Sequence, residues 1–467
     1  MTSQSAGRTA RFTQETLQDF VGRSGQPQIG RDDVNPAMIR HWCMALEDRN
    51  PIYVDEQRAK KAGLGGVIAP PAMMQAWTMP DYGSSPPAKD AVAELYALLD
   101  SDGYVGIVAT NSEQEYLVPL KIGDRVTSTK TINMVSEAKT TKLGEGHFIT
   151  SNIEYVNQRG ETVGRQLHRV LKYRPPSDRK LSPREQTLPR PRPNVTQDTA
   201  FYFEAAGQRR LVIQGCDVCH QLQHPPTAAC RACGSLELSP VQMSGRGKLF
   251  SYTIIHAPVI PPFEAPYNVI LVDLEEGPRI VSELRDIAPA DIRIGMDLEV
   301  DFLDLPPDFG LPVFRRAAAP VAVDEGAAAT AKIGDALPPL SIPLTRSKII
   351  ATAIATRDFQ LVHHDHEVAQ ARGSEDIFMN IITTQGLVAR FVTDWAGADA
   401  KLRKIAITLG TPNYAGDTMV MSGSVVDRRP SEGGTDLDLA VTGNNSRGSH
   451  VAGTVTIHLP ENGDHAR

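Results

Sequence analysis

The sequence predicts an α+β protein of three blocks, in which two related helix-then-strand blocks flank a strand-rich block that begins with paired cysteines. Two observations lead to this prediction: an ungapped internal repeat at an offset of 310 residues, and two Cys-x2-Cys pairs close together in a cysteine-poor chain. The length of 467 residues agrees with several domains, because one domain usually takes about 100–200 residues.

Composition limits the class of protein and of partner. Hydrophobic residues make up 41% and charged residues 22%, as in ordinary globular proteins. No run approaches the ~18 apolar residues of a membrane helix, and the first residues contain no apolar signal segment. The net charge of −7 disfavours nucleic acid or an anionic membrane as the main partner. We therefore expect a soluble, cytoplasmic protein that binds neither.

Two segments are typical of linkers and divide the chain. Residues 174–193 contain six prolines and five arginines without an apolar period, which favours an extended tether. Residues 316–336 are rich in alanine with Gly and Pro breaks, so a tether is favoured over a surface helix. The expected domains are block one (1–173), block two (197–315) and block three (338–467), joined by linkers at 174–196 and 316–337.

Block one begins with a helix and continues as strands. Asn35 suits a helix N-cap and Pro36 the first helical position, and apolar residues then recur at helical spacing up to Leu46. Cys43 falls inside this apolar helix, where we expect a small buried side chain. Alternating β-branched and aromatic residues predict strands at 115–118, 124–129, 147–156 and 167–173.

Block two begins with Cys216-x2-Cys219 and, ten residues later, continues with Cys230-x2-Cys233. Four thiolates at this spacing predict a tetrahedral Zn²⁺ site with a structural role, and redox pairs or coincidence are the weaker alternatives. Strand-like runs follow at 247–255, 268–274, 279–284 and 296–302.

Block three repeats the order of block one. Thr345 is expected to cap a helix over 347–355, and a second helix covers about 377–395. Strands are expected at 405–409, 418–426, 437–442 and 450–459. The aligned pairs include Asp48 with Asp358, Asp55 with Asp365, Gln75 with Gln385, and Gly123-Asp124 with Gly416-Asp417. Block one carries about 17 more residues between these anchors, which places an insertion at 81–101 and indicates duplication or fusion of two related folds.

The segment 47–55, EDRNPIYVD, resembles the hydratase loop of MaoC-like enoyl-CoA hydratases, whose motif is D-x-N-P-x-H-x-D. The resemblance implies that blocks one and three are hot-dog units, each an antiparallel sheet around a central helix. Block one has Tyr53 where the family has His. Block three loses the Asn-Pro pair but keeps Asp358 and His363 at the D-x4-H spacing.

Hydration of a 2-enoyl thioester needs a base for the attacking water and a proton for C2. An Asp and a His converging on one water can do both near neutral pH, whereas Tyr53 is a poor base because its ordinary pKa is about 10. The resemblance therefore implies that Asp358 and His363 are catalytic and that block one holds the CoA or acyl tail without doing chemistry. A lone D-x4-H is common in surface turns, and His364 is an alternative imidazole.

The thioester oxygen needs hydrogen-bond donors as it gains charge, and in the family a His-Gly turn at the start of the central helix supplies them. The matching positions are Asn380-Ile381 in block three, which we assign to oxyanion and substrate binding. In block one the match is Pro70-Pro71, and Pro71 has no N–H to donate. The aspartates Asp55 and Asp365 are expected only to cap the next short helix.

Two longer segments carry a more specific resemblance. Residues 357–397 resemble the short active subunit of two-subunit hydratases of bacterial steroid side-chain degradation, and CDVCHQLQHPPTAACRACGS resembles the ribbon of zinc-ribbon-plus-OB modules found with acyl-CoA and thiolase-type enzymes. A nucleic-acid role for an OB fold is opposed by 16 acidic against 10 basic residues in 197–316.

The resemblances imply a single-chain hydro-lyase with a structural zinc ion and no redox cofactor. Its substrate would be a bulky, steroid-type enoyl-CoA, and a thiolase-like aldolase would dock on the ribbon-OB module. Two alternatives stay open: a hydratase or dehydratase for another acyl thioester, and a protein that is chiefly a scaffold for an aldolase. A homodimer of fused chains is a further hypothesis.

Overall fold

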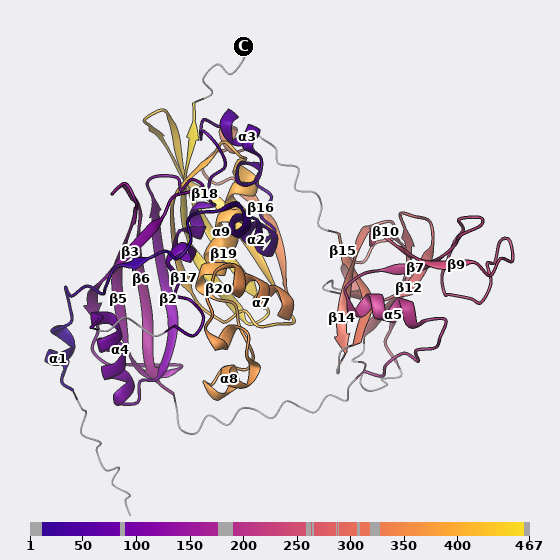
Figure 1. The fold of residues 1–467 in the computed structure, drawn as a ribbon, viewed down its shortest axis with the longest axis horizontal. Helices are drawn as coiled ribbons and strands as arrows, with labels where there is room; N and C mark the ends of the chain where they lie inside the picture. Colours follow the sequence, from indigo (N-terminus) through magenta and orange to yellow (C-terminus); the bar gives the residue numbers. More distant parts are fainter. Residues whose placement is uncertain are drawn as a thin grey trace, which may run out of the picture. The chain divides into compact units, whose positions relative to one another are not determined.

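The computed structural model describes residues 12–84, 89–175, 190–257, 263, 266–285, 287, 289–305, 309–317 and 327–461 (Figure 1). The chain divides into two compact units: unit 1 comprises Met1–Leu181 with Val321–Arg467, and unit 2 comprises Ser182–Pro320. Blocks one and three therefore share one unit. Most of the predicted linker at 174–196, and residues 318–326 of the other, lie outside the described residues, so the exact domain boundaries stay predictions. Among the described residues, no helix combines the length and apolarity needed to cross a membrane.

The block-one part of unit 1 starts with helices and continues as an antiparallel sheet. The Asn35 side chain caps α2 by accepting from the Met38 N–H at 2.9 Å, as predicted, and Cys43 is buried. The helices are α1 (Gln14–Gln18), α2 (Pro36–Leu46), η1 (Pro51–Tyr53), α3 (Glu56–Lys61), η2 (Pro71–Thr78) and α4 (Ala91–Ser101). The strands are β1 (Gln28–Ile29), β2 (Gly106–Tyr116), β3 (Val126–Val135), β4 (Lys139–Thr141), β5 (Gly144–Asn157) and β6 (Thr162–Arg174).

The block-three part repeats this order. Thr345 caps the helix that begins at Arg346, where its hydroxyl accepts from the Lys348 N–H at 3.0 Å. The helices are α6 (Ala327–Thr330), α7 (Arg346–Ala355), η4 (Leu361–His363), α8 (His366–Ala371) and α9 (Ile381–Ala396). The strands are β16 (Ala336–Leu344), β17 (Lys401–Leu409), β18 (Asp417–Ser431), β19 (Gly434–Asn445) and β20 (Gly448–Pro460). Helix α6 and the start of β16 lie within the segment predicted as an Ala-rich linker.

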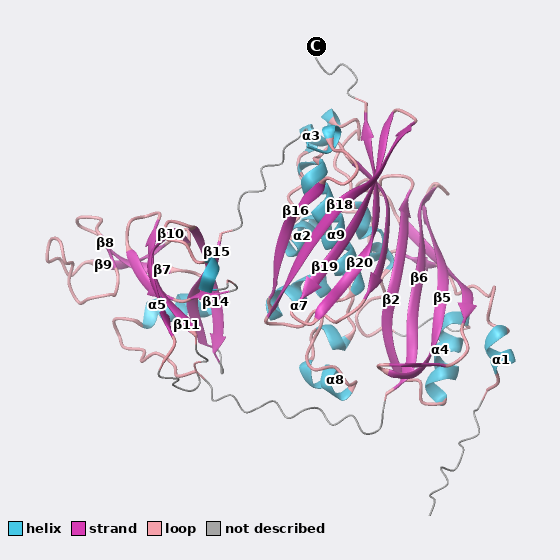
Figure 2. Ribbon diagram, turned by 180° about the vertical axis from the view of Figure 1, so that it is seen from behind, coloured by secondary structure: helices cyan, strands magenta, loops and turns pink. Residues whose placement is uncertain are grey.

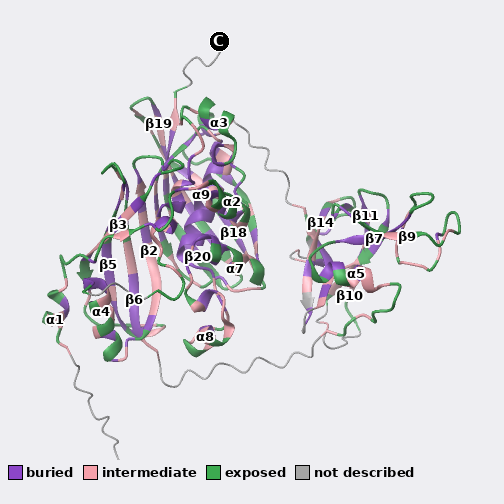
Figure 3. Cartoon of the chain, in the orientation of Figure 1, coloured by how far each residue is buried: buried purple, intermediate pink, exposed green. Residues whose placement is uncertain are grey.

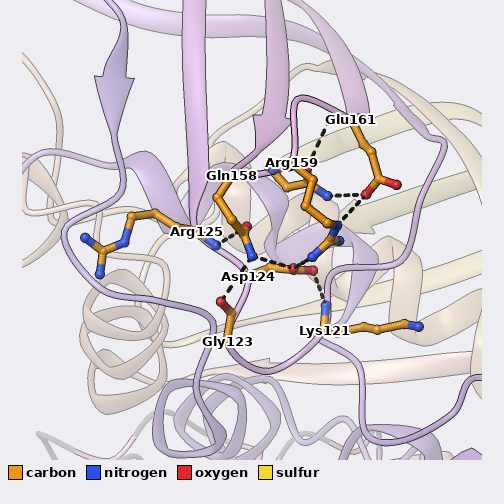
Figure 4. Close-up of polar contacts among 8 residues, drawn as sticks. Lys121, Gly123, Asp124, Arg125, Gln158, Arg159 and Glu161 are labelled. Carbon is orange, nitrogen blue, oxygen red and sulfur yellow. Dashed lines mark hydrogen bonds and ion pairs between the residues drawn. The ribbon is translucent and has the colours of Figure 1, made fainter.

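The sequence repeat is also a repeat of backbone conformation. Glu47 and Arg357, which are 310 residues apart, both have φ near 57°, a left-handed conformation that is uncommon for residues other than glycine. Asp55 caps α3 and Asp365 caps α8 through their side chains, as expected. Gly123 and Gly416 have φ near 90° in the turns that lead into β3 and β18. Figure 4 shows the first of these turns, where Asp124 accepts from the Lys121 N–H at 2.9 Å.

One sheet runs through both parts of unit 1 (Figure 2). Its strand order is β1-β3-β5-β6-β2-β17-β20-β19-β18-β16, with β4 paired to β5. Strands β2 and β17 form the joint, and their antiparallel pairing is centred on Glu113 opposite Ala406. The Lys404 ammonium adds an ion pair to Glu113 across the joint at 2.5 Å. The two hot-dog sheets are therefore continuous through backbone hydrogen bonds.

A buried polar network lies beneath this joint. Gln75 and Gln385, which align in the repeat, are linked through side chains of β2 and β6. The Gln166 amide donates to Gln75 and to Ser112, both at 3.0 Å, and the Ser112 hydroxyl donates to Gln385 at 2.9 Å. Buried polar groups are costly unless they are paired, so this network fixes the alignment of the two halves.

The central elements of the two halves differ in length. Helix α9 has 16 residues, most of which are buried (Figure 3), whereas η2 is a 3-10 helix of eight residues. Prolines explain the short element, because η2 starts at Pro71 and Pro80 follows Met79, whose backbone is extended. The predicted insertion contains α4, whose Leu95 and Leu99 pack in a cluster with Ile132 and Ile149 of the sheet.

Unit 2 contains a small sheet and a larger one. The small sheet has the order β8-β7-β9, and the larger has the order β12-β11-β10-β14-β15-β13. Its core joins residues of both sheets with Tyr202 of α5 (Ala200–Gly207). The strands are β7 (Val212–Cys216), β8 (Leu222–Gln223), β9 (Leu238–Gln242), β10 (Arg246–Ile255), β11 (Tyr267–Leu274), β12 (Arg279–Ser282), β13 (Leu284–Arg285), β14 (Asp297–Leu305) and β15 (Phe309–Arg316), with η3 (Pro289–Asp291) between β13 and β14.

Candidate active site and metal centre

Asp358 and His363 are brought together by a tight loop after α7. The left-handed residue Arg357 reverses the chain, and the Asp358 N–H then donates to the Ala353 carbonyl at 3.0 Å. The Gln360 N–H donates to Asp358 Oδ1 at 3.4 Å. The single 3-10 turn η4 follows and returns His363 towards the carboxylate, so a purely local fold produces the pair.

The two side chains are in contact and buried. Asp358 Oδ2 lies 3.4 Å from His363 Nε2, and each residue is only 5% exposed. His363 Nδ1 lies 2.7 Å from the Phe378 carbonyl, which can only accept a hydrogen bond, so we assign the neutral imidazole proton to Nδ1. The Phe378 ring also packs edge-on against the imidazole, with centroids 5.0 Å apart. The free Nε2 lone pair therefore faces the carboxylate, where both can bind one water.

The start of α9 provides amide donors near this loop. The Asn380 side chain caps the helix by accepting from the Thr383 N–H at 2.6 Å, and it donates to the Thr356 hydroxyl at 2.9 Å. The Asn380 side chain is thus occupied within the protein. The Ile381 N–H is in the first turn, where amides have no intrahelical acceptor and the helix dipole favours negative charge. Oxyanion binding by Asn380 and Ile381 stays a prediction, and the backbone amide suits it better than the Asn380 side chain.

Sequence reasoning missed two buried histidines near these elements. His450 on β20 contacts the Thr384 hydroxyl of α9 at 2.9 Å and the Thr411 carbonyl at 2.7 Å, and burial lowers its pKa to about 4. His168 on β6 has a pKa lowered to about 3, chiefly by burial and then by Lys130, while Asp358 opposes the shift. His168 Nε2 has no hydrogen-bond partner among the described residues. The strand pattern placed both residues in strands but could not show which strands meet α9 or Asp358.

The matching loop of block one has the same fold and different chemistry. The Asn50 N–H donates to Asp48 Oδ1 at 3.1 Å, and burial raises the pKa of Asp48 to about 6. Tyr53 occupies the position of His363, and burial followed by the Asp48 charge raises the pKa of its phenol well above its ordinary value. Pro71, the match of Ile381, begins η2 without an N–H. This loop therefore lacks both the imidazole base and the equivalent amide donor.

The four cysteines of block two converge in unit 2. Their Sγ atoms all lie within 4.8 Å of one another, with Cys216 and Cys233 at 3.6 Å and Cys219 and Cys230 at 3.5 Å. A tetrahedral zinc ion with Zn–S bonds of about 2.3 Å places sulfurs about 3.8 Å apart, so the cluster fits Zn²⁺. The protein has a zinc ribbon, and the four thiolates close the coordination shell, as a structural site requires.

The ribbon contains two similar knuckles. In each knuckle, the carbonyl of the first cysteine accepts a hydrogen bond from the backbone N–H of the residue four positions later. The His220 N–H donates to the Cys216 carbonyl, and the Gly234 N–H donates to the Cys230 carbonyl, both at 2.9 Å. Both donors have positive φ, 59° and 75°. The Ala232 N–H also donates to Cys230 Sγ at 3.4 Å, a contact that favours the thiolate form that a metal binds.

Three family models match the chain. The model described as "FAS1-like, dehydratase domain region" matches residues 19–166. The model "ChsH2, rubredoxin-like zinc ribbon domain" matches residues 203–239, and "ChsH2, C-terminal OB-fold domain" matches residues 240–303. The sequence predictions of a MaoC-like unit, a zinc ribbon and an OB fold are confirmed.

Several proteins of known name are similar to the chain. The "Probable enoyl-CoA hydratase alpha subunit" of Thermomonospora curvata is 46% identical, over 65% of this chain and 96% of the relative. Both subunits of the 3-oxo-4,17-pregnadiene-20-carboxyl-CoA hydratase of Mycobacterium tuberculosis also match. The alpha subunit is 39% identical over 60% of this chain and 90% of the subunit, and the beta subunit is 45% identical over 27% and 95%. A "DUF35 domain-containing scaffold protein" of Pyrococcus furiosus is 37% identical over 20% of this chain and 67% of the relative.

Solved structures extend the comparison. A MaoC-like dehydratase matches 95% of this chain and 99% of its own length with a TM-score of 0.52 at 15% identity, which shows a shared fold. A chain described as "Ltp2-ChsH2(DUF35) aldolase" is 50% identical over 27% of this chain and all of its own length, with a TM-score of 0.27.

Proposed function

The chain belongs to the MaoC-like enoyl-CoA hydratases, which are hydro-lyases, and we propose that block three adds water across the α,β double bond of a bulky enoyl-CoA. The observation that carries the assignment to block three is the buried contact between Asp358 and His363, 3.4 Å apart. The matching loop of block one has Tyr53 instead of the imidazole. Block one then acts as a structural partner that helps to hold the substrate.

The pair Asp358–His363 moves the protons of the reaction. Neutral His363 accepts a proton at Nε2 as the oxygen of the bound water attacks C3, while the Asp358 carboxylate accepts the second hydrogen of that water as a hydrogen bond. The Phe378 carbonyl holds the Nδ1–H and stabilises the imidazolium that forms. The pair then returns one proton to C2, so the net change is the addition of one water.

The first turn of α9 stabilises the charge on the thioester oxygen. As water attacks C3, electron density moves to this oxygen and an enolate develops. The Ile381 N–H and the positive end of the helix dipole suit this charge, because oriented amides in a dry site stabilise an oxyanion without reorganising. The Asn380 cap, through its bond to Thr356, positions this turn.

The finer proposal is that the acyl group is a steroid side chain. The Mycobacterium tuberculosis relative is named as a hydratase of such a thioester. The eight-residue η2 of block one also fills less space than the 16-residue α9 of block three, which favours a bulky acyl group.

A panel of enoyl-CoAs from short linear to steroid-sized tests the function. We expect every turnover product to gain the mass of one water, and kcat/KM for the steroid-sized substrate to exceed that of the short ones by at least ~100-fold, because apolar pockets gain roughly 1–3 kcal/mol per methylene-sized contact. A preference for short linear substrates would contradict the steroid proposal and leave the hydratase intact. No mass gain with any member would contradict the hydratase itself.

We also propose that unit 2 docks a thiolase-like aldolase, which would cleave the hydrated product. One support is the sequence identity with a protein named as a DUF35 domain-containing scaffold protein. The other is the net negative charge of unit 2, which suits a protein partner better than nucleic acid. Unit 2 has a hydrophobic core of its own, so its removal need not disturb unit 1.

Deleting residues 197–315 is expected to abolish co-purification with a co-expressed thiolase-like aldolase while hydration by unit 1 continues. The control is the full-length chain carrying His363→Ala, which should lose hydration and still retain the aldolase. Survival of the complex after the deletion would show that unit 2 is not the docking site. Absence of hydration by the full-length wild-type chain, with the aldolase still bound, would favour a mainly scaffolding protein.

A further inference from the structure

A cavity of about 370 Å³ lies in unit 1 beside the loop of block one that lacks the catalytic groups. Tyr53 and Pro71, the matches of His363 and Ile381, both line it. The cavity volume falls in the range of about 300–1,000 Å³ that small-molecule sites occupy. Block one has therefore kept a ligand-sized space at the position where block three has its catalytic pair.

The cavity is separate from the catalytic pair. Neither Asp358 nor His363 lines it. It lies near the far part of α9, because Arg390 donates to the Leu46 carbonyl at 2.7 Å just before the loop that carries Tyr53. Ten residues of helix separate Arg390 from Asn380, which corresponds to about 15 Å along the axis.

Both halves of unit 1 build the walls of the cavity, and the walls are mainly apolar. Ile68, Met74 and Val163 come from block one, and Leu402 comes from the start of β17 in block three. All four side chains contribute hydrocarbon surface, and burying an acyl chain against them would remove that surface from water at about 25 cal/mol per Å².

The rim of the cavity is cationic. Lys121, Lys401 and Arg403 line it, all three are exposed, and none has an ion-pair partner among the residues that the structure describes. Lys401 and Arg403 flank the buried Leu402 in the sequence, where the register of β17 shifts between Leu402 and Lys404. The acidic lining residue Asp399 is already paired with Arg58 at 2.9 Å.

The close-up of the Asp124 turn shows that Lys121 is not drawn into the neighbouring polar cluster. Its backbone N–H donates to Asp124, whereas its side chain extends away from Asp124 and Arg159 (Figure 4). Arg159 instead pairs with Asp124 at 2.7 Å. The Lys121 ammonium is therefore available to an anion at the cavity rim.

We propose that this cavity is a second, non-catalytic binding site for an acyl thioester of the CoA type. The acyl chain lies against the apolar wall, and the phosphates meet Lys121, Lys401 and Arg403. The site retains bound thioester unchanged, because Tyr53 is no base and Pro71 donates no hydrogen bond. The choice of a thioester as ligand rests on the proposed function, whereas the cavity and its charge do not.

Titration of the full chain with decanoyl-CoA, followed by calorimetry, tests this site. Decanoyl-CoA is saturated and cannot be hydrated. We expect two molecules bound per chain, and the double variant Lys401→Glu/Arg403→Glu should weaken one of the two binding events by roughly tenfold or more, since both rim charges reverse. Hydration kcat and KM should stay at the wild-type values, because neither residue contacts the catalytic pair.

The matched control is Lys139→Glu/Lys142→Glu, which makes the same change in net charge at two exposed positions outside the cavity lining. This control should still bind two molecules per chain. A wild-type stoichiometry of one, or equal loss in both double variants, would overturn the proposal.

Two further titrations, with free CoA and with decanoate, show whether the second site recognises the CoA part, the acyl chain or both. Free CoA should bind the second site more weakly than decanoyl-CoA, and decanoate should bind it more weakly than either. Decanoate binding as tight as that of decanoyl-CoA would overturn the assignment to a thioester. Failure of hydration with two molecules still bound would contradict the proposed function and leave this second site standing.

Discussion

Replacing His363 with alanine is expected to lower kcat for enoyl-CoA hydration by a factor of about 10²–10⁴, the usual contribution of a positioned general base. His363 Nε2 faces Asp358, and no other described imidazole contacts that carboxylate within ion-pair distance. In the proposed mechanism, removing the ring leaves Asp358 without the neutral base that takes the proton from water. Steady-state kinetics with the best substrate of the enoyl-CoA panel measures the effect.

His364→Ala is the matched control, because it removes a neighbouring imidazole that is only partly buried. It should keep wild-type turnover, and both variants should keep the melting temperature of unit 1 within a few degrees. Unchanged turnover of His363→Ala would remove this residue from the catalytic site. A large loss in His364→Ala alone would assign the base to the alternative imidazole.

Replacing Cys216 with serine is expected to remove the bound zinc and unfold the ribbon. The cluster supplies four sulfurs at near-tetrahedral spacing, and structural zinc sites contribute an apparent binding free energy on the order of 10 kcal/mol. Metal analysis should find about one zinc per wild-type chain and almost none in the variant. Limited proteolysis should cut unit 2 of the variant first.

The control for this change is Cys43→Ser, which replaces the cysteine that lies outside the cluster in α2. Its zinc content should equal that of the wild type, even though a buried hydroxyl can destabilise unit 1. Cys216→Ser should leave hydration unchanged at temperatures where unit 1 is folded. A Cys216→Ser chain with full zinc content would contradict the four-cysteine site.

Local sequence signals predicted much of the fold and of the candidate site. The residue types around Asn35, Asp55 and Thr345 predicted that these three side chains cap helices, and the structure shows the same three caps. The contact between Asp358 and His363 also depends on a few consecutive residues. Features set by short stretches of chain can be predicted from one sequence, because the backbone offers few conformations there.

Features that depend on pairing between distant strands could not be predicted in the same way. The Asp358 charge raises the pKa of His168, which lies on a strand about 190 residues away in the sequence, and no periodicity indicates that proximity. The cavity beside Tyr53 combines β17 with block one, so its walls exist only after the two halves join. The 3-10 conformation of η2 was also not predicted, although its flanking prolines account for it.

The continuous sheet across β2 and β17 has a consequence for the enzyme at low abundance. In a hydratase made of two separate subunits, dilution shifts the association equilibrium towards incomplete, inactive particles. Here the partners share one polypeptide, so each half meets the other at a fixed effective concentration that does not fall with cellular protein level. Synthesis also yields the two halves in equal numbers. The edge of β17 that pairs with β2 is therefore always supplied with its partner strand.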